Sequence, residues 1–203
     1  ITVTGGGNLY VNGEAKIFEN AKVLVESDSL ATFNHAAYVG GGTSAGNAVI
    51  ELDGGSIVLN EKNEKAGTEG SLTVGDGGTL AITGTGTSTI TQNGLSEDSP
   101  GVDIVGGGRL TVDTTATLAI DMLRIASQDN GAAGAVIDGT VKATYFRAYG
   151  DGIVDVNNAL NVDNLDIADN AVINVNSKAK IGENTIGGVD NIITVSGGTL
   201  NIE

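Results

Sequence analysis

The chain has 203 residues, of which 32 are Gly, one is Pro and none is Cys, and its formal net charge is −15. Without Cys, disulfide frameworks, thiol nucleophiles and zinc–cysteine sites are excluded. Lys and Arg are too few to neutralise phosphates, so we expect no nucleic acid partner. No apolar run approaches a membrane span, so we expect no direct membrane insertion by this segment.

A repeated unit runs through the chain, with two arms of alternating apolar and polar residues joined by a turn of Gly, Asn or Asp. Such alternation is the period of a β-strand, and the turn residues tolerate positive φ. The clearest copies, in chain order, are ITVTGGGNLYV (1–11), VIELDGGSIVL (49–59), LTVGDGGTLAI (72–82), VDIVGGGRLTV (102–112), VDVNNALNV (154–162) and ITVSGGTLNI (193–202).

The first part of the chain repeats less regularly. In the segment 12–48, one candidate strand lies around Val23 and Val25. Gly is too frequent for a helix, and no charged run is long enough to form one. Polar stretches are expected to form loops inserted at corners of the repeat, near 60–70, 84–100 and 127–134.

The second part of the chain decides between an antiparallel meander and stacked parallel coils. Comparable arms follow one another at steps of 18, 18 and 21 residues, beginning at Val136, Val154, Val172 and Ile193. A second arm has two alternating halves joined by a two-residue corner, with copies at Leu118–Ile125, Val141–Ala148 and Leu160–Ile167. Such a near-constant period is typical of a solenoid.

We therefore predict an all-β fold, a right-handed parallel β-helix with about three short strands per coil and roughly eight or nine coils. At about 4.8 Å per coil the rod would be roughly 40 Å long. Residues 1–203 are expected to form a single β-solenoid domain that is a segment of a longer rod.

Copies of Φ-x-Φ-x-G-G-x-Φ-x-Φ with Asn- and Thr-rich corners, no Cys and an acidic balance resemble the passenger regions of bacterial autotransporters and related large surface adhesins of the parallel β-helix type. The resemblance covers nearly the whole chain. It implies export across the outer membrane, an extracellular place on the bacterial cell surface, and a structural or adhesive role without catalysis. The partner that it implies is a protein or glycan on the surface of a host or neighbouring cell.

A cluster of aromatic and basic side chains is the best candidate for a binding surface. Tyr beside Arg is common at recognition surfaces, and aromatic faces also stack on sugars. Phe146 lies within the cluster but aligns with Leu123 and Leu165, so we expect it in the core. The candidate binding residues are Tyr145, Arg147, Tyr149 and, one coil earlier at the position matching Arg147, Arg124.

Several other polar groups have a structural interpretation. Stacked Asn side chains near corners can form hydrogen-bonded ladders along a rod, as expected for Asn157, Asn158, Asn164, Asn170, Asn174, Asn176 and Asn191. The lone His35 has no second His beside it. Carboxylates that could supply calcium ligands match neither the β-helix nonapeptide nor the EF-hand, so we expect no metal and no cofactor; they are Asp163, Asp166, Asp169 and Asp190.

Two alternatives remain open. A polysaccharide-degrading β-helix enzyme needs converging carboxylates, and the best set is Asp151 and Asp155 beside Arg147, although we expect no catalytic residue and no enzyme. The first unit, ITVTGG, is nearly the same as the last, ITVSGG, so Ile1 and Ile193 are expected to begin equivalent strands. Both ends would expose unpaired strand edges, which suits a self-assembling filament or surface-layer component that stacks end to end.

Overall fold

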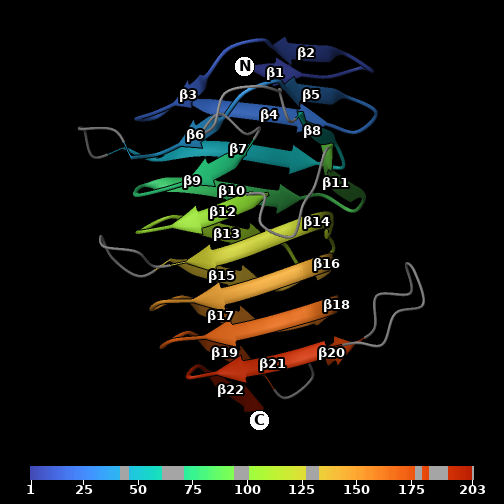
Figure 1. Cartoon of the computed structure of the whole chain (residues 1–203). Helices are drawn as coiled ribbons and strands as arrows, with labels where there is room; N and C mark the ends of the chain where they lie inside the picture. The colour runs from blue at the N-terminus through green and yellow to red at the C-terminus, as the bar shows by residue number, and fades with distance from the viewer. Residues whose placement is uncertain are drawn as a thin grey trace.

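The computed structural model describes most of the chain, namely residues 1–41, 46–60, 71–93, 101–126, 133–176, 180–182 and 192–202. Within these ranges the regular elements are all β-strands, and every pairing between two strands is parallel. No helix in this described part could cross a membrane. The strands stack into an elongated body, from β1–β3 at one end to β20–β22 at the other (Figure 1).

One sheet contains one strand from each coil of the chain, and we call this sheet the first face. Its strands follow one another in chain order without a reversal. They are β1 (Thr2–Val3), β4 (Lys22–Glu26), β7 (Ala48–Asp53), β10 (Gly78–Thr83), β13 (Arg109–Val112), β15 (Gly134–Ile137), β17 (Ile153–Val156), β19 (Val172–Val175) and β22 (Thr199–Ile202).

The second sheet is bent along its length into two further faces. The second face contains β2 (Asn8–Val11), β5 (Leu30–Phe33), β8 (Ser56–Asn60), β11 (Thr87–Asn93) and β20 (Lys180–Gly182). The third face contains β3 (Ala15–Ile17), β6 (Ala37–Val39), β9 (Leu72–Val74), β12 (Val102–Val105) and β21 (Ile192–Ser196). Three longer strands belong to both faces, β14 (Thr117–Ala126), β16 (Thr140–Tyr149) and β18 (Ala159–Ala168).

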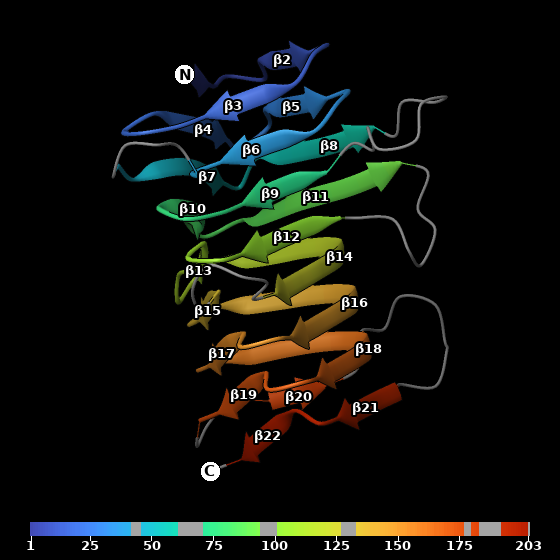
Figure 2. The same cartoon turned by 60° about the vertical axis from the view of Figure 1, so that its left-hand side comes forward.

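The bend falls where the sequence predicts a two-residue corner. The first arm of β14 pairs with β11 and its second arm pairs with β12. Between the arms the alternation breaks, because Met122 and Leu123 are consecutive and both buried, and two residues separate Ile120 from Leu123. Figure 2 shows β14, β16 and β18 bending in the same way, one below another.

The core lies between the three faces and is built from stacked aliphatic side chains. Alternation along each strand places every second side chain inside. On the third face, Phe146 is fully buried between Leu123 and Leu165, its register partners on the neighbouring strands. The predicted core position of Phe146 is confirmed.

At a Gly–Gly corner the two positions require glycine for different reasons, as Gly107 and Gly108 show. Gly107 has φ +80°, in the left-handed region that favours glycine. Gly108 has no such φ, but a Cβ there would collide with the carbonyl oxygen of Val74 on the preceding coil. The same division of roles holds for the pair at 54–55, so each pair combines a turn with a close approach of two backbones.

The predicted register of the first face is wrong by one residue. Val136 pairs with Asp155, and Asp155 pairs with Asn174, so successive positions are 19 residues apart. Val136 therefore points outward, whereas Val154 points inward and is buried. Because side chains alternate along a strand, a shift of one residue exchanges the inner and outer sets.

The two ends of the chain are also not equivalent. Ile1 precedes β1 on the first face, whereas Ile193 lies in β21 on the third face and pairs with Leu165. The repeated unit occurs at two different corners: 49–59 joins the first face to the second, and 72–82 joins the third face to the first. Similar local sequence therefore does not imply an equivalent place in the fold.

The predicted loops are corrected where strands enter their bounds: Asn60 ends β8 and Gly134 begins β15. Residues 87–93, inside the segment 84–100, form strand β11 instead of a loop. Thr87, Thr89 and Thr91 alternate with buried Ser88 on this strand, which explains the dense Thr pattern there. Residues 61–70, 94–100 and 127–132, on which the rest of the loop predictions fall, lie outside the described residues.

Hydrogen-bonded Asn ladders run along the outside of the stack, as predicted for the later part of the chain. Asn174 donates to Asp155 and Asn201 donates to Asn174, each over 2.8 Å. Asn157 donates to Asp138 over 2.7 Å, and Asn176 donates in turn to Asn157. Asn170 donates to Asp151. Asn164 instead donates to the carbonyl oxygen of Thr144, and Asn191 lies outside the described residues.

A further ladder in the earlier part of the chain is missed by the sequence analysis. Asn34 donates to Asn12 over 2.6 Å, and Asn60 donates to Asn34 and Asn93 to Asn60, each over 2.7 Å. Each of these Asn residues ends or follows a strand of the second face. In every ladder the later residue donates to the earlier one, so the side chains add a continuous set of hydrogen bonds along the stacking direction.

Candidate functional site

Four charged side chains form a row across the outer surface of the third face. Each residue of the row pairs in register with the next one. Asp103 of β12 pairs with Arg124 of β14, and Arg124 pairs with Arg147 of β16. Arg147 in turn pairs with Asp166 of β18. We call this row, Asp103–Arg124–Arg147–Asp166, the Asp–Arg ladder. The predicted match of Arg124 with Arg147 is confirmed by the register.

The first pair of the ladder is held firmly. Arg124 Nη2 donates to Asp103 Oδ2 over 2.6 Å, and Arg124 Nε donates to Asp103 Oδ1. The side chains are only 18% and 15% exposed. A two-point bond between a guanidinium and a carboxylate is directional and charge-assisted, so Arg124 is held by Asp103.

The second pair of the ladder is looser. Arg147 Nε lies 3.9 Å from Asp166 Oδ2, and the two side chains are 34% and 42% exposed. Exposed ion pairs at this separation contribute at most about 1 kcal/mol. Among the described residues, the terminal guanidinium nitrogens of Arg147 have no closer partner, so they can bind a ligand.

Two tyrosines flank the Asp–Arg ladder. Tyr149 takes the next outward position on β16 after Arg147 and is partly exposed. Burial is the main cause that raises the pKa of the Tyr149 phenol, while Arg124 and Arg147 lower it and Asp103 raises it. Tyr149 therefore stays protonated at neutral pH and can donate a hydrogen bond.

Tyr145 lies at the bend between the second and third faces. Its register partners are Met122, which is buried, and Asn164, which is partly exposed. The Tyr145 side chain is itself partly exposed, so its ring is presented beside the ladder. All four predicted binding residues therefore lie on the outer surface of β14 and β16.

The cluster combines donors, acceptors and aromatic rings, and the charges of the ladder cancel. Such a surface suits a polar ligand without a large net charge, which can hydrogen-bond to Arg147 and Tyr149 and stack on a ring. Asp103 and Asp166 also belong to this surface, although they were not predicted as part of it. The offsets of 21 residues from Asp103 to Arg124 and 19 residues from Arg147 to Asp166 were the only signal for them.

The carboxylates considered for catalysis do not converge with Arg147. Asp155 lies on the first face and accepts a hydrogen bond from Asn174. Asp151 lies in the turn before β17 and accepts from Asn170, whereas Arg147 lies on the third face. The best catalytic set from the sequence is therefore divided between two sheets.

The acids considered as calcium ligands each have different surroundings. Asp166 belongs to the Asp–Arg ladder, and Asp169 accepts from the backbone N–H of Gly150 over 3.4 Å. Asp163 is buried in β18, where burial raises the pKa of its carboxyl. Asp190 lies outside the described residues, and within them no group of three or more His, Cys, Asp or Glu side chains could hold a metal ion.

Comparison of the chain with protein-family models, with curated proteins and with solved structures gives no match. The surfaces of the chain and the stacking of its strands are therefore the basis for its proposed function.

Proposed function

We propose that this chain is a right-handed parallel β-helix of eight to nine coils that serves as a structural or adhesive segment of an extracellular bacterial surface protein. The observation that carries the proposal is the uninterrupted parallel stacking from β1 to β22, reinforced by Asn ladders on the outside. Stacked coils with neighbours only above and below produce an extended rod, which suits a spacer between a cell and its partner.

The adhesive part of the proposal is supported by the third face. Arg147, Tyr145 and Tyr149 are partly exposed on regular strands of a packed scaffold. Binding groups on rigid elements lose little conformational freedom when a ligand binds. The cancelling charges of the Asp–Arg ladder favour a neutral glycan or a polar protein surface over a strongly charged partner.

A bead assay tests the adhesive role. The purified chain is coupled to fluorescent beads, and bead binding is counted on epithelial cells and on bacterial cells, with beads carrying an unrelated acidic protein as the blank. We expect binding above the blank, reduced at least fivefold by the double substitution Arg147→Gln and Tyr149→Ser.

The matched control is Lys142→Gln, which removes one positive charge from the same strand but on the second face, where Lys142 is exposed. Equal loss of binding by the control and by the double variant would remove the third face from the proposal. Binding no higher than the blank on any cell type would leave only the structural role, which small-angle scattering tests by the expected elongated particle.

A second candidate function is self-assembly end to end. The outermost strands β21 and β22 leave Ile193, Val195 and Ile202 exposed, although they continue the inward-pointing stacks of the core. Among the described residues, β1, β2 and β3 pair only with the strands of the next coil. Sedimentation that stays monomeric over a hundredfold range of concentration would contradict assembly, and filaments in negative-stain images would support it.

A further inference from the structure

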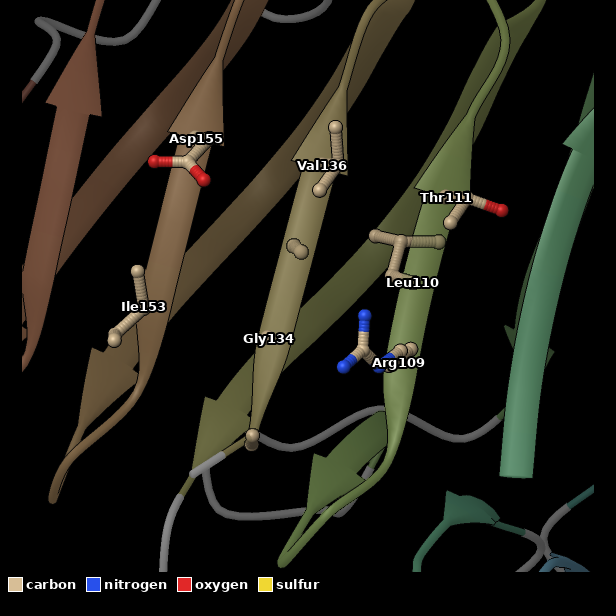
Figure 3. A pocket seen from close by; sticks show the side chains of 9 residues that line it. Arg109, Leu110, Thr111, Gly134, Val136, Ile153 and Asp155 are labelled. Carbon is tan, nitrogen blue, oxygen red and sulfur yellow. The ribbon is translucent and has the colours of Figure 1, made fainter. Parts of the chain in front are cut away.

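A shallow hollow of about 220 Å³ lies on the outside of the first face, away from the Asp–Arg ladder. It is formed by three adjacent strands, β13, β15 and β17, and its labelled side chains are shown in Figure 3. The volume is below the roughly 300–1,000 Å³ of sites for drug-sized ligands. The hollow therefore has room for a group of about one sugar residue.

The hollow exists because one position in a row of outward side chains is Gly. Arg109, Gly134 and Ile153 are register partners on the three strands. A Cβ built on Gly134 would meet its nearest neighbour, the Ile153 carbonyl oxygen, only at 3.8 Å. The floor is thus bare backbone, with a side chain standing on each side of it.

The polar groups stand at opposite edges of the hollow. Arg109 is exposed and makes no ion pair in the described part of the chain. Its guanidinium extends from β13 toward the strand that carries Gly134 (Figure 3). On the far strand, Asp155 uses Oδ1 to accept from Asn174, which leaves the second carboxylate oxygen available as an acceptor.

The remaining walls are apolar. Val136 is 36% exposed and Ile153 is 43% exposed, and both line the hollow beside Gly134. Thr111, the register partner of Val136, lines the edge of the hollow on β13, and its hydroxyl points away from Val136 (Figure 3). The hollow therefore presents a cation at one edge, an acceptor at the other, and apolar side chains beside its backbone floor.

We propose that this hollow binds a single carboxylated sugar residue, such as a uronic acid, at the end or within a glycan chain. Arg109 would pair with the sugar carboxylate through two parallel N–H···O bonds. The C–H face of the ring would cover Gly134, Val136 and Ile153, while ring hydroxyls donate to Asp155. The site deepens the adhesive function proposed above and rests on it for its biological use.

The chemistry of the edges favours this ligand class over its nearest relatives. A neutral sugar would leave the Arg109 guanidinium without an acceptor of matching charge. A compact inorganic anion would contact neither the apolar walls nor the acceptor edge at Asp155. A ligand with one anionic group, one apolar face and several hydroxyls uses all three parts of the hollow.

An NMR titration tests the site. Methyl glucuronide is added to the ¹⁵N-labelled chain, with methyl glucoside as a probe of the same shape that lacks the carboxylate. We expect saturable shifts of amides in 109–111, 134–136 and 153–155, with a dissociation constant on the order of 1 mM, and no saturation with the glucoside. Arg109→Gln is expected to weaken glucuronide binding about tenfold.

Gly134→Val fills the hollow without touching its polar groups and is expected to abolish binding, because its side chain enters open space on a strand. Two controls should bind normally: Ala81→Val adds two methyl groups on the first face outside the hollow, and Lys142→Gln removes a positive charge from the second face. Equal affinity for glucuronide and glucoside, unchanged binding by Arg109→Gln, or no saturable shifts would each overturn the site. Such results would leave the bead assay on the third face unaffected, so failure of the site and failure of the adhesive role are distinguishable.

Discussion

Replacing Phe146 by Ala would remove one of the largest fully buried side chains in the described core. Its neighbours Leu123 and Leu165 sit on strands that are hydrogen-bonded to β16 on both sides, at a spacing of about 4.8 Å. The backbone hydrogen bonds between these strands keep them from moving together to fill the cavity that the Ala variant would leave. Phe→Ala changes in cores cost about 3–5 kcal/mol, and we expect the upper half of that range.

A domain of this size loses about 2–4 °C of melting temperature for each kcal/mol, which corresponds to a fall of roughly 8–20 °C. Equilibrium urea unfolding, followed by circular dichroism and by Tyr fluorescence, measures the free energy of unfolding. Coincident transitions with the two probes would support two-state behaviour. Phe146→Leu fills most of the space and is expected to cost about 1 kcal/mol.

The adjacent residue provides the sharpest control. Arg147 points outward, and its ion pair within the described part of the chain is long, so Arg147→Ala is expected to cost about 1 kcal/mol or less. If Phe146→Ala cost under about 1.5 kcal/mol, or if both Ala variants cost the same, the assignment of inner and outer faces on β16 would be wrong.

Three further changes test other parts of the fold. Asn34→Ala removes two side-chain hydrogen bonds of the ladder and should lower the free energy of unfolding by about 1–2 kcal/mol in urea titrations, whereas Asn158→Ala, at an exposed turn position, should change it by under about 0.5 kcal/mol. Gly108→Ala forces a Cβ against the Val74 carbonyl oxygen and should cost more than about 2 kcal/mol; a neutral result in the same titration would contradict the close approach. Because the pKa of Tyr149 is raised on folding, its contribution to stability is complete below the unfolded pKa near 10 and is lost as pH rises through the folded pKa. The melting temperature should therefore fall more steeply above about pH 10 in the wild type than in Tyr149→Phe, and equal slopes would exclude this linkage.

The sequence predicted the parallel stacking and the bend because both leave a local mark. Alternation marks each arm, and the two-residue corners at 121–122, 144–145 and 163–164 mark the bend at offsets of 23 and 19 residues. The same offsets aligned Arg124 with Arg147. These predictions depend on local sequence alone and do not require a given turn to be assigned to one of the corners between the faces.

The register of the first face was not predictable in the same way. Val136, Val154 and Val172 look alike in sequence, yet Val154 points inward and the other two point outward. The Gly–Gly unit serves two different corners, since both need a turn and a close backbone approach. Local composition therefore could not distinguish them, and only pairing across coils does.

The hollow and the earlier Asn ladder depend on contacts between coils of unequal length. Asn12, Asn34, Asn60 and Asn93 are separated by 22, 26 and 33 residues, so no fixed period connects them. Gly134 stood at the end of a predicted loop, but it begins β15 and forms the floor between Arg109 and Ile153.

Register pairs in the described strands link residues no closer than 19 positions in the chain, as for Gly134 with Ile153, and no farther than 35, as for Ala37 with Leu72. Within the described strands, no pairing joins the beginning of the chain to its end. Each new coil thus needs only the coil before it as a template, and loop closure never spans more than a few dozen residues. The chain can therefore acquire its structure progressively from one end while the remainder is still extended, as a polypeptide does when it emerges through a narrow opening.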